Sequence, residues 1–152
     1  MADGSGTNLK AKASFQSDAY MFKMNSSAAS SHSLGAQDSG KTYFLDSTVA
    51  RTITLPAPVA GQTYKLIYGG AAEETENLII VTPGNSNFFL GGVVHMDSDA
   101  DNVSVYSDGN SNSKLTLTDF GIFEINIVAK DSTNYYIWGY QEGADAPAFA
   151  DQ

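Results

Sequence analysis

The stretch that decides the expected fold is TITLPAPVAGQTYKLIY, Thr52 to Tyr68. Ile53 and Leu55 alternate with threonines before a short proline-rich run, and Leu66 lies in a second alternating segment after it. A period of two is typical of a strand that covers a core with one face. Proline fixes φ and removes a backbone donor, so it ends a strand ladder. We therefore expect a strand, a stiff turn and a partner strand.

The same signals continue along the chain. From Lys41 onward, turn residues recur about every 8–12 residues, which is typical of an all-β sandwich or barrel. Among the turns we count Gly91-Gly92, because adjacent glycines tolerate turn geometry. The expected strands are residues 41–46, 51–55, 62–68, 78–82, 88–90, 93–96, 103–107, 114–118, 122–128 and 135–140. The predicted fold is an antiparallel β-sandwich, jelly-roll-like, behind an extended N-terminal arm.

Composition divides the chain into three parts. Residues 1–40 are rich in Ser, Ala, Gly and Asn, and NSSAASSHS at 25–33 resembles a flexible linker. We therefore expect a flexible arm over 1–40, a β-sandwich domain over 41–141 and an acidic tail over 142–152. The three lysines and three aspartates of the arm cancel, so the net charge of -9 belongs to the remainder of the chain.

The arm contains one strand-like segment, LKAKASF. Its residues Leu9, Ala11, Ala13 and Phe15 alternate with polar residues, as in a strand with one covered face. Fixing the backbone costs about 1–2 kcal/mol per residue, and so small an apolar set cannot offset that cost alone. We predict that these four residues are the anchoring contact of the arm and order against a partner; whether the arm pairs with its own subunit or with a neighbouring one stays open. A disordered leader is the alternative reading.

Charge and composition exclude several classes of protein. The chain has 17 acidic and 8 basic residues, and a net negative charge repels phosphate backbones and anionic lipid. It has no cysteine and no apolar run near the ~18 residues that a membrane span needs. We expect no nucleic-acid partner, no membrane association and no disulfide. The only histidines, His32 and His95, have no nucleophile and acid in a recognisable motif, so we expect no enzyme and no cofactor.

The one candidate metal site is DSDADN, Asp97 to Asn102. Asp97, Asp99 and Asp101 are spaced like the first ligands of a calcium loop, and calcium prefers oxygen ligands. The match is incomplete, because Asn102 stands where glycine is expected and Val103 begins a strand. We expect a solvated acidic turn and no metal, with calcium binding as the alternative.

The last predicted strand is bulky on both faces. Tyr136, Trp138 and Tyr140 lie on one face, and Tyr135 and Ile137 lie on the other. Such a strand is central in a sandwich or meets another subunit with its outer face. We place the subunit interface on Tyr135, Tyr136, Trp138 and Tyr140. The eight tyrosines also allow a sugar-stacking surface, although tyrosine is favoured in strands in any case.

Three segments carry a family resemblance. DSGKTYFLD (38–46), TITLPAPVAGQTYKLIYGG (52–70) and KDSTNYYIWGY (130–140) together resemble small virion proteins of tailed bacteriophages, notably marine and cyanobacterial ones. In those proteins similar motifs occur in capsid decoration proteins and in β-rich tail-fibre domains. The resemblance covers about residues 38–140 and specifies a fold more than a task.

The resemblance implies a head decoration, or cement, protein. Such a protein binds the major capsid protein on the outer shell, usually as a homotrimer, and bridges neighbouring capsomers. It is assembled in the host cytoplasm and resides on the virion surface. The alternative that the resemblance leaves open is a tail-fibre or adhesion module that binds a host-surface glycan.

Overall fold

The computed structural model describes residues 22–24, 31–45, 50–69, 76–97 and 99–152, the first of these as backbone only. Within them the chain forms two β-sheets and one short 3-10 helix, η1 (Ala36–Asp38). The strands are β1 (Phe22–Met24), β2 (Ser31–Ser33), β3 (Thr42–Leu45), β4 (Arg51–Thr54), β5 (Thr63–Gly69), β6 (Leu78–Val81), β7 (Phe88–Asp97), β8 (Val103–Tyr106), β9 (Lys114–Leu117), β10 (Phe120–Ala129), β11 (Asn134–Gly143) and β12 (Ala148–Ala150). No helix in this part of the chain is long and apolar enough to cross a membrane.

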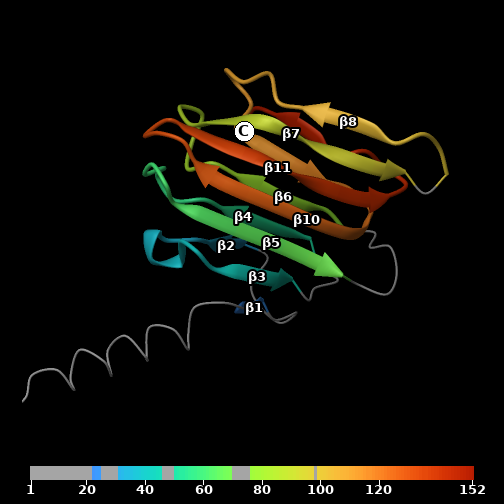
Figure 1. Ribbon diagram of the computed structural model, residues 1–152, viewed down its shortest axis with the longest axis horizontal. Helices are drawn as coiled ribbons and strands as arrows, with labels where there is room; N and C mark the ends of the chain where they lie inside the picture. The colour runs from blue at the N-terminus through green and yellow to red at the C-terminus, as the bar shows by residue number, and fades with distance from the viewer. Residues whose placement is uncertain (1–21, 25–30, 46–49, 70–75, 98) are drawn as a thin grey trace, which may run out of the picture.

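The two sheets pack face to face as a β-sandwich (Figure 1). The seven-stranded sheet has the order β1-β3-β5-β10-β11-β7-β8, and the five-stranded sheet has the order β12-β9-β6-β4-β2. In the long strands buried residues alternate with residues that are at least partly exposed. The predicted all-β sandwich is therefore confirmed.

One core lies between the sheets. Ile53 and Ile80 enter it from the five-stranded sheet, and Leu66 and Ile125 enter it from the seven-stranded sheet, all of them fully buried. Aromatic rings fill one end, where Phe120 meets both Tyr68 and Phe123 with ring centroids 5.1 Å apart in each pair. The inner faces of both sheets are thus apolar, as the alternating sequence pattern requires.

Residues 52–68 do not form the expected hairpin. β4 pairs with β2 and β6 in the five-stranded sheet, whereas β5 pairs with β3 and β10 in the seven-stranded sheet. The proline-rich run between them is therefore a corner that leads the chain from one sheet to the other. The Tyr135 hydroxyl donates a hydrogen bond of 2.8 Å to the carbonyl oxygen of Pro56, which ties this corner to β11. The expectation of a strand and its direct partner was wrong.

The sheets are mixed, which corrects the expectation of purely antiparallel pairing. Parallel neighbours are β1 with β3, β3 with β5, β2 with β4, β4 with β6, and β7 with β11. From β1 to β6 successive strands alternate between the two sheets. A chain that crosses to the other sheet and returns enters its first sheet in the original direction, so each strand lies parallel to the strand two places earlier. The hairpin of β10 and β11 is antiparallel, as expected.

β7 is one continuous strand where the sequence suggested two. It pairs with β11 from Phe88 to Asp97, straight through Gly91 and Gly92. Gly91 has φ +120°, and a Cβ there would meet the carbonyl oxygen of Ile137 on β11. The two glycines therefore allow close approach of neighbouring backbones and do not form the expected turn.

The predicted sandwich domain, residues 41–141, is too short at both ends. β2 pairs with β4, and Leu34 is buried in the core, so the sandwich begins at least by residue 31. At the other end β12 pairs with β9, and Phe149 packs against the core. The side chain of Gln152 donates hydrogen bonds to the carbonyl oxygens of Thr82 and Ser113. The C-terminal residues therefore belong to the five-stranded sheet and are not a separate tail.

Burial of Ile53 and Leu66 predicts the cost of shortening them. Each is fully buried, and they come from opposite sheets. Ile53→Ala or Leu66→Ala should lower the free energy of unfolding by about 2–5 kcal/mol, measured by urea denaturation. Val59→Ala is the control, because Val59 is 60% exposed and should change stability by less than about 0.5 kcal/mol. Equal effects at all three positions would contradict the described core.

The close approach at Gly91 gives a second prediction. Gly91→Ala should destabilise the fold by about 1–3 kcal/mol, because the added Cβ collides with the backbone of β11 and φ is positive. Gly84→Ala is the matched control, because nothing lies within 4 Å of a Cβ at that position. Thermal melts of the two variants give the comparison. A Gly91→Ala melt that coincides with that of Gly84→Ala would refute the continuous β7–β11 ladder.

Candidate interaction surface

The outer face of the seven-stranded sheet is the candidate functional surface. On this face β11 presents the aromatic strip, which we define as Tyr136, Trp138 and Tyr140. Tyr136 is 46% exposed and Trp138 is 49% exposed, and Tyr140 is partly buried. The intervening residues Tyr135 and Ile137 face the core. Alternation along β11 therefore sorts adjacent aromatic residues between the core and the surface.

An apolar patch lies on the β7 and β8 side of this strip. We define it as Val94, Met96 and Tyr106, all of which are exposed. Val94 is directly opposite Tyr140 in the ladder, and Tyr106 is opposite Gly92. A Cβ at Gly92 would lie 2.6 Å from Cδ1 of Tyr106, so the tyrosine ring covers this glycine. Exposed apolar side chains that gather on one face are typical of an interaction surface.

A polar trio lies on the other side of the strip, on β5 and β10. The trio consists of Lys65, Glu124 and Asn126. Lys65 Nζ lies 2.7 Å from Glu124 Oε1, and Asn126 Nδ2 donates to the same oxygen at 3.2 Å. The hydrogen bond from Lys65, followed by that from Asn126, lowers the pKa of the Glu124 carboxyl. The carboxylate is therefore charged and held in place by its two neighbours.

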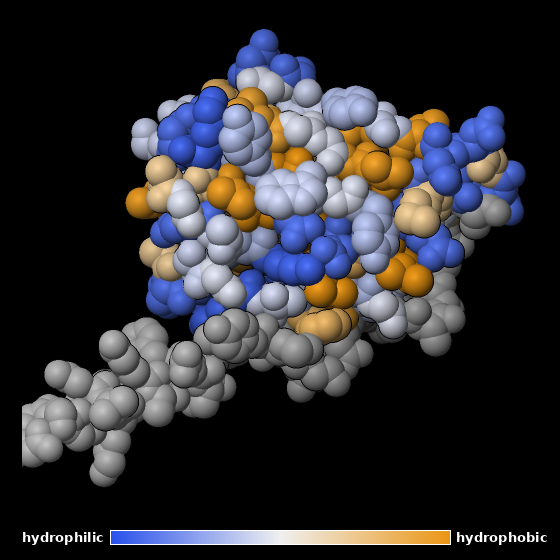
Figure 2. Space-filling model, in the orientation of Figure 1, coloured by the Kyte–Doolittle hydropathy of each residue, from blue (hydrophilic) through white to orange (hydrophobic). Residues whose placement is uncertain are grey.

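The strip and the trio meet at a shallow hollow. Asn126 pairs with Lys65 on one side and with Trp138 on the other, so the three residues form one row across the sheet. The hollow has a volume of about 250 Å³. Its lining residues are Gly40, Lys41, Thr42, Thr63, Tyr64, Lys65, Asn126, Ile127, Val128 and Trp138. Figure 2 shows this face, with polar side chains near the middle and pale aromatic and orange apolar side chains around them.

The predicted subunit interface is corrected at one residue. Tyr135 is fully buried in the core and cannot contact another subunit. Burial, with a smaller contribution from Tyr64, raises the pKa of its hydroxyl. Tyr136, Trp138 and Tyr140 do lie on the outer face, and their role as an interface stays a prediction. The anchoring residues Leu9, Ala11, Ala13 and Phe15 lie outside the described residues.

The acidic turn at Asp97 to Asp101 is held together by its own hydrogen bonds. Asp97 Oδ1 accepts from the backbone nitrogens of Asp99 at 2.8 Å and Ala100 at 3.0 Å. Asn102 Oδ1 accepts from the backbone nitrogen of Asp97 at 3.1 Å. Across the described ranges, no group of three or more His, Cys, Asp or Glu side chains could hold a metal ion. The contacts of Asp97 are those of an Asx turn.

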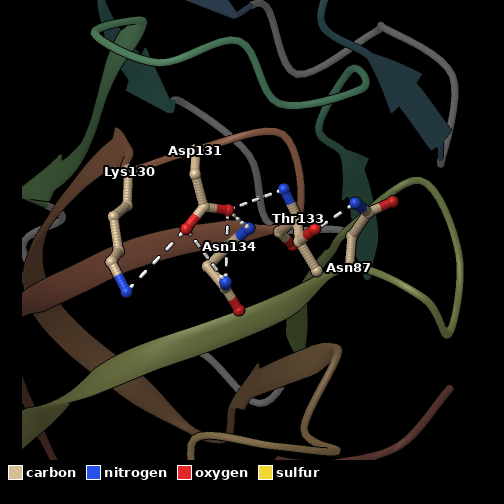
Figure 3. Close-up of polar contacts among 5 residues, drawn as sticks. All are labelled: Asn87, Lys130, Asp131, Thr133 and Asn134. Carbon is tan, nitrogen blue, oxygen red and sulfur yellow. Dashed lines mark hydrogen bonds and ion pairs between the residues drawn. The ribbon is translucent and has the colours of Figure 1, made fainter.

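A second acidic loop orders the β10–β11 turn (Figure 3). Asp131 Oδ1 accepts from the backbone nitrogens of Thr133 at 2.7 Å and Asn134 at 2.8 Å. The hydrogen bond from Thr133, followed by those from Asn134, lowers the pKa of Asp131. Asn87 Nδ2 donates to the Thr133 carbonyl oxygen at 3.3 Å, which joins this turn to the loop before β7. This carboxylate stabilises the turn.

The histidines occupy structural positions. His95 is buried on the inner side of β7, and its Nε2 lies 2.8 Å from the carbonyl oxygen of Gly143. His95 is therefore a hydrogen-bonded residue within a strand. His32 lies in β2, with its ring centroid 6.3 Å from that of Tyr43, and so is not part of a linker.

The sequence reading missed the polar trio and the apolar patch. Their residues are on strands that were predicted, but the rows in which they meet depend on the pairing of β5 with β10 and of β7 with β11. Alternation alone predicts that Lys65, Glu124 and Asn126 face away from a core. It does not predict which of them are neighbours.

Comparison of the chain with protein-family models, with curated proteins and with solved structures finds no significant match. The resemblance to phage virion proteins therefore stays a prediction from the three quoted segments.

The polar trio gives a prediction about acid–base behaviour. Lys65→Met should raise the pKa of Glu124 toward its ordinary value, because the lysine hydrogen bond is the largest cause of the shift. A carboxyl group whose pKa is lower in the folded state than in the unfolded state stabilises the fold at pH values above its ordinary pKa. This stability is lost as the pH falls through the lowered pKa. The variant should therefore lose less stability on acidification. Carboxyl NMR titration measures the pKa, and Lys114→Met, on β9 of the other sheet, should leave it unchanged. An unaltered Glu124 titration in Lys65→Met would contradict the described ion pair.

Proposed function

We propose that this chain is a head decoration protein of a tailed bacteriophage. In this role it is a virion structural protein that binds the outer capsid surface, bridges capsomers and stabilises the shell, without performing chemistry. Its partner is the major capsid protein, and it acts as a homotrimer on the capsid surface after assembly in the host cytoplasm. The proposal starts from the resemblance over residues 38–140.

The observation that carries the proposal is the apolar patch on the outer face of the seven-stranded sheet. Val94, Met96 and Tyr106 leave apolar area in water, and Tyr106 is 70% exposed. When another protein surface covers these side chains, their apolar area is removed from water, which stabilises the assembly by about 25 cal/mol for each Å² buried. We place the contact between subunits on this patch together with Tyr140. Tyr136 and Trp138 are left out of it, because Lys130 lies over the Tyr136 ring and Trp138 lies beside Asn126 of the polar trio.

Charge and connectivity support the same role. The net charge of -9 lies outside residues 1–40, so the sandwich is acidic and repels other acidic particles. Among the described strands, β1 is the last in the order of the seven-stranded sheet, and it follows residues 1–21 in the sequence. A segment such as Leu9 to Phe15 can add a strand to a capsid-protein sheet through main-chain hydrogen bonds. Three such arms on one trimer bind more tightly than one, because the second and third contacts are intramolecular.

Deletion of residues 1–21 tests the anchoring role. The variant should fold with the same melting temperature as the full chain, because the core residues from Leu34 onward are retained. Its occupancy on purified capsids of the phage that encodes the chain, measured by cosedimentation and electron microscopy, should fall by at least about tenfold as the anchor is lost.

The full chain at matched concentration is the reference for occupancy, and light scattering gives the oligomeric state of both proteins. Unchanged occupancy of the deletion variant would rule out anchoring by the arm. A full chain that is a monomer at every concentration and never binds capsids would overturn the decoration role and favour the adhesion module.

A further inference from the structure

We propose that the hollow between Trp138 and the polar trio is a binding site for a neutral, β-linked hexopyranose chain. Such a sugar has a flat face of C–H bonds and an edge of hydroxyl groups. The site offers an aromatic surface for the face and a set of hydrogen-bonding groups for the edge. This proposal is independent of the capsid role, because a decoration protein and a tail-fibre module could both carry it.

The aromatic part of the site is available to a ligand. Trp138 is about half exposed. Tyr136 lies two residues earlier on the same face of β11. Two residues along a strand span about 6.6–6.8 Å, so Tyr136 is the next outward-facing side chain along β11, although only Trp138 lines the hollow. Lys130 Nζ lies 5.8 Å from the Tyr136 ring centroid, at the end of the strip away from Tyr140.

The polar part supplies the donors and acceptors that hydroxyl groups need. A hydroxyl donates one hydrogen bond and accepts others, so it is best matched by a donor and an acceptor side by side. Lys65 and Asn126 line the hollow and donate, and Glu124, which both of them contact but which does not itself line the hollow, accepts. The side chains of Lys65 and Glu124 remain 35% and 31% exposed, so a ligand can reach them. Their mutual contacts hold them in place before a ligand arrives, which reduces the entropy lost on binding.

The shape of the site favours a sugar over a buried small molecule. Pockets that enclose drug-sized ligands have volumes of about 300–1,000 Å³. The hollow is open and has a volume of about 250 Å³. Its lining residues also include Thr42 on β3 and Thr63 on β5, which lie across the hollow from Trp138 on β11. A ligand that lies across the surface fits this shape better than one that must be enclosed.

The ion pair argues against a protein occupant at this hollow. A dry protein interface would remove Lys65 and Glu124 from water, which costs more than their attraction returns unless every polar group is satisfied. Sugar hydroxyls replace the hydrogen bonds of the displaced water. A protein contact has no such cost at the apolar patch, where Tyr106 lies beyond Gly92 from Trp138 and Val94 lies beside Tyr140.

The charged side chains around the hollow and the net charge of the chain favour a neutral sugar. The lysines around the site are matched with acids: Lys41 with Asp38 at 2.8 Å, Lys65 with Glu124 at 2.7 Å and Lys130 with Asp131 at 3.8 Å. These three lysines therefore offer no uncompensated positive charge. The net charge of -9 repels anionic polymers. Acidic polysaccharides are therefore disfavoured at this surface.

Titration of the full chain with cellohexaose and with N-acetylchitohexaose tests the proposal. Trp138 is the only tryptophan in the chain, so its fluorescence reports on the site directly. At least one of the two oligosaccharides should shift this emission and give a saturable heat in calorimetry, and alginate, an acidic polymer, should give neither.

Variants then locate the binding. Trp138→Ala should weaken the affinity by about tenfold, and Trp138→Phe should keep part of it, since it retains an aromatic ring. Lys65→Met should also weaken binding. Val59→Ala is the control, because Val59 is exposed but does not line the hollow, and this variant should bind like the unaltered chain. Circular dichroism verifies that each variant folds.

Three results would overturn the proposal. The first is that neither oligosaccharide binds the full chain at millimolar concentration. The second is that alginate binds more tightly than both. The third is that Trp138→Ala binds sugar as well as the unaltered chain does. If Trp138→Ala instead dissociates an oligomer while sugar binding is absent, the hollow belongs to a subunit contact.

Discussion

The structure depends on one constraint, which is that the chain alternates between two sheets while keeping its apolar residues between them. From β1 to β6 each strand lies in the sheet opposite to its predecessor, so neighbours within a sheet run parallel. The corner at Pro56 is one of these crossings, and the Tyr135 hydroxyl fixes it. Because Ile53 and Leu66 must meet in one core from opposite sheets, this path also fixes which residues face outward.

The outer surface follows from the inner one. Since Ile125 and Ile127 face the core on β10, Glu124 and Asn126 must face outward, and the ladder with β11 then brings Asn126 beside Trp138. The result is a single sheet face with polar groups near the middle and apolar groups toward β8 (Figure 2). The two proposed contacts, one with protein and one with sugar, thus use neighbouring parts of one sheet face, with Trp138 toward β10 and the apolar patch on β7 and β8.

Most of the acidic residues with lowered pKa values serve local structure. Asp108 accepts hydrogen bonds from the backbone nitrogens of Asn110, Ser111 and Asn112, and with the Ser111 hydroxyl these bonds lower its pKa. Asp131 orders the β10–β11 turn in the same way. Such carboxylates supply acceptors where the chain reverses without a sheet partner. The acidic character of the chain therefore serves turns as well as surface charge.

Alternation of apolar and polar residues determined, without any structure, that the chain is an all-β sandwich, that most of its strands lie where they do, and that Tyr136, Trp138 and Tyr140 share a face. The pattern is local, because neighbouring residues on a strand point to opposite sides. It could not determine which strands are partners, so the hairpin at Pro56 and the turn at Gly91 were mistaken. The placement of Tyr135 at an interface was wrong for another reason, because alternation puts it on the face opposite Tyr136, which is the core face. Only the tertiary structure decided that Lys65, Asn126 and Trp138 lie in one row, because pairing between distant segments depends on how two sheets bury a common core.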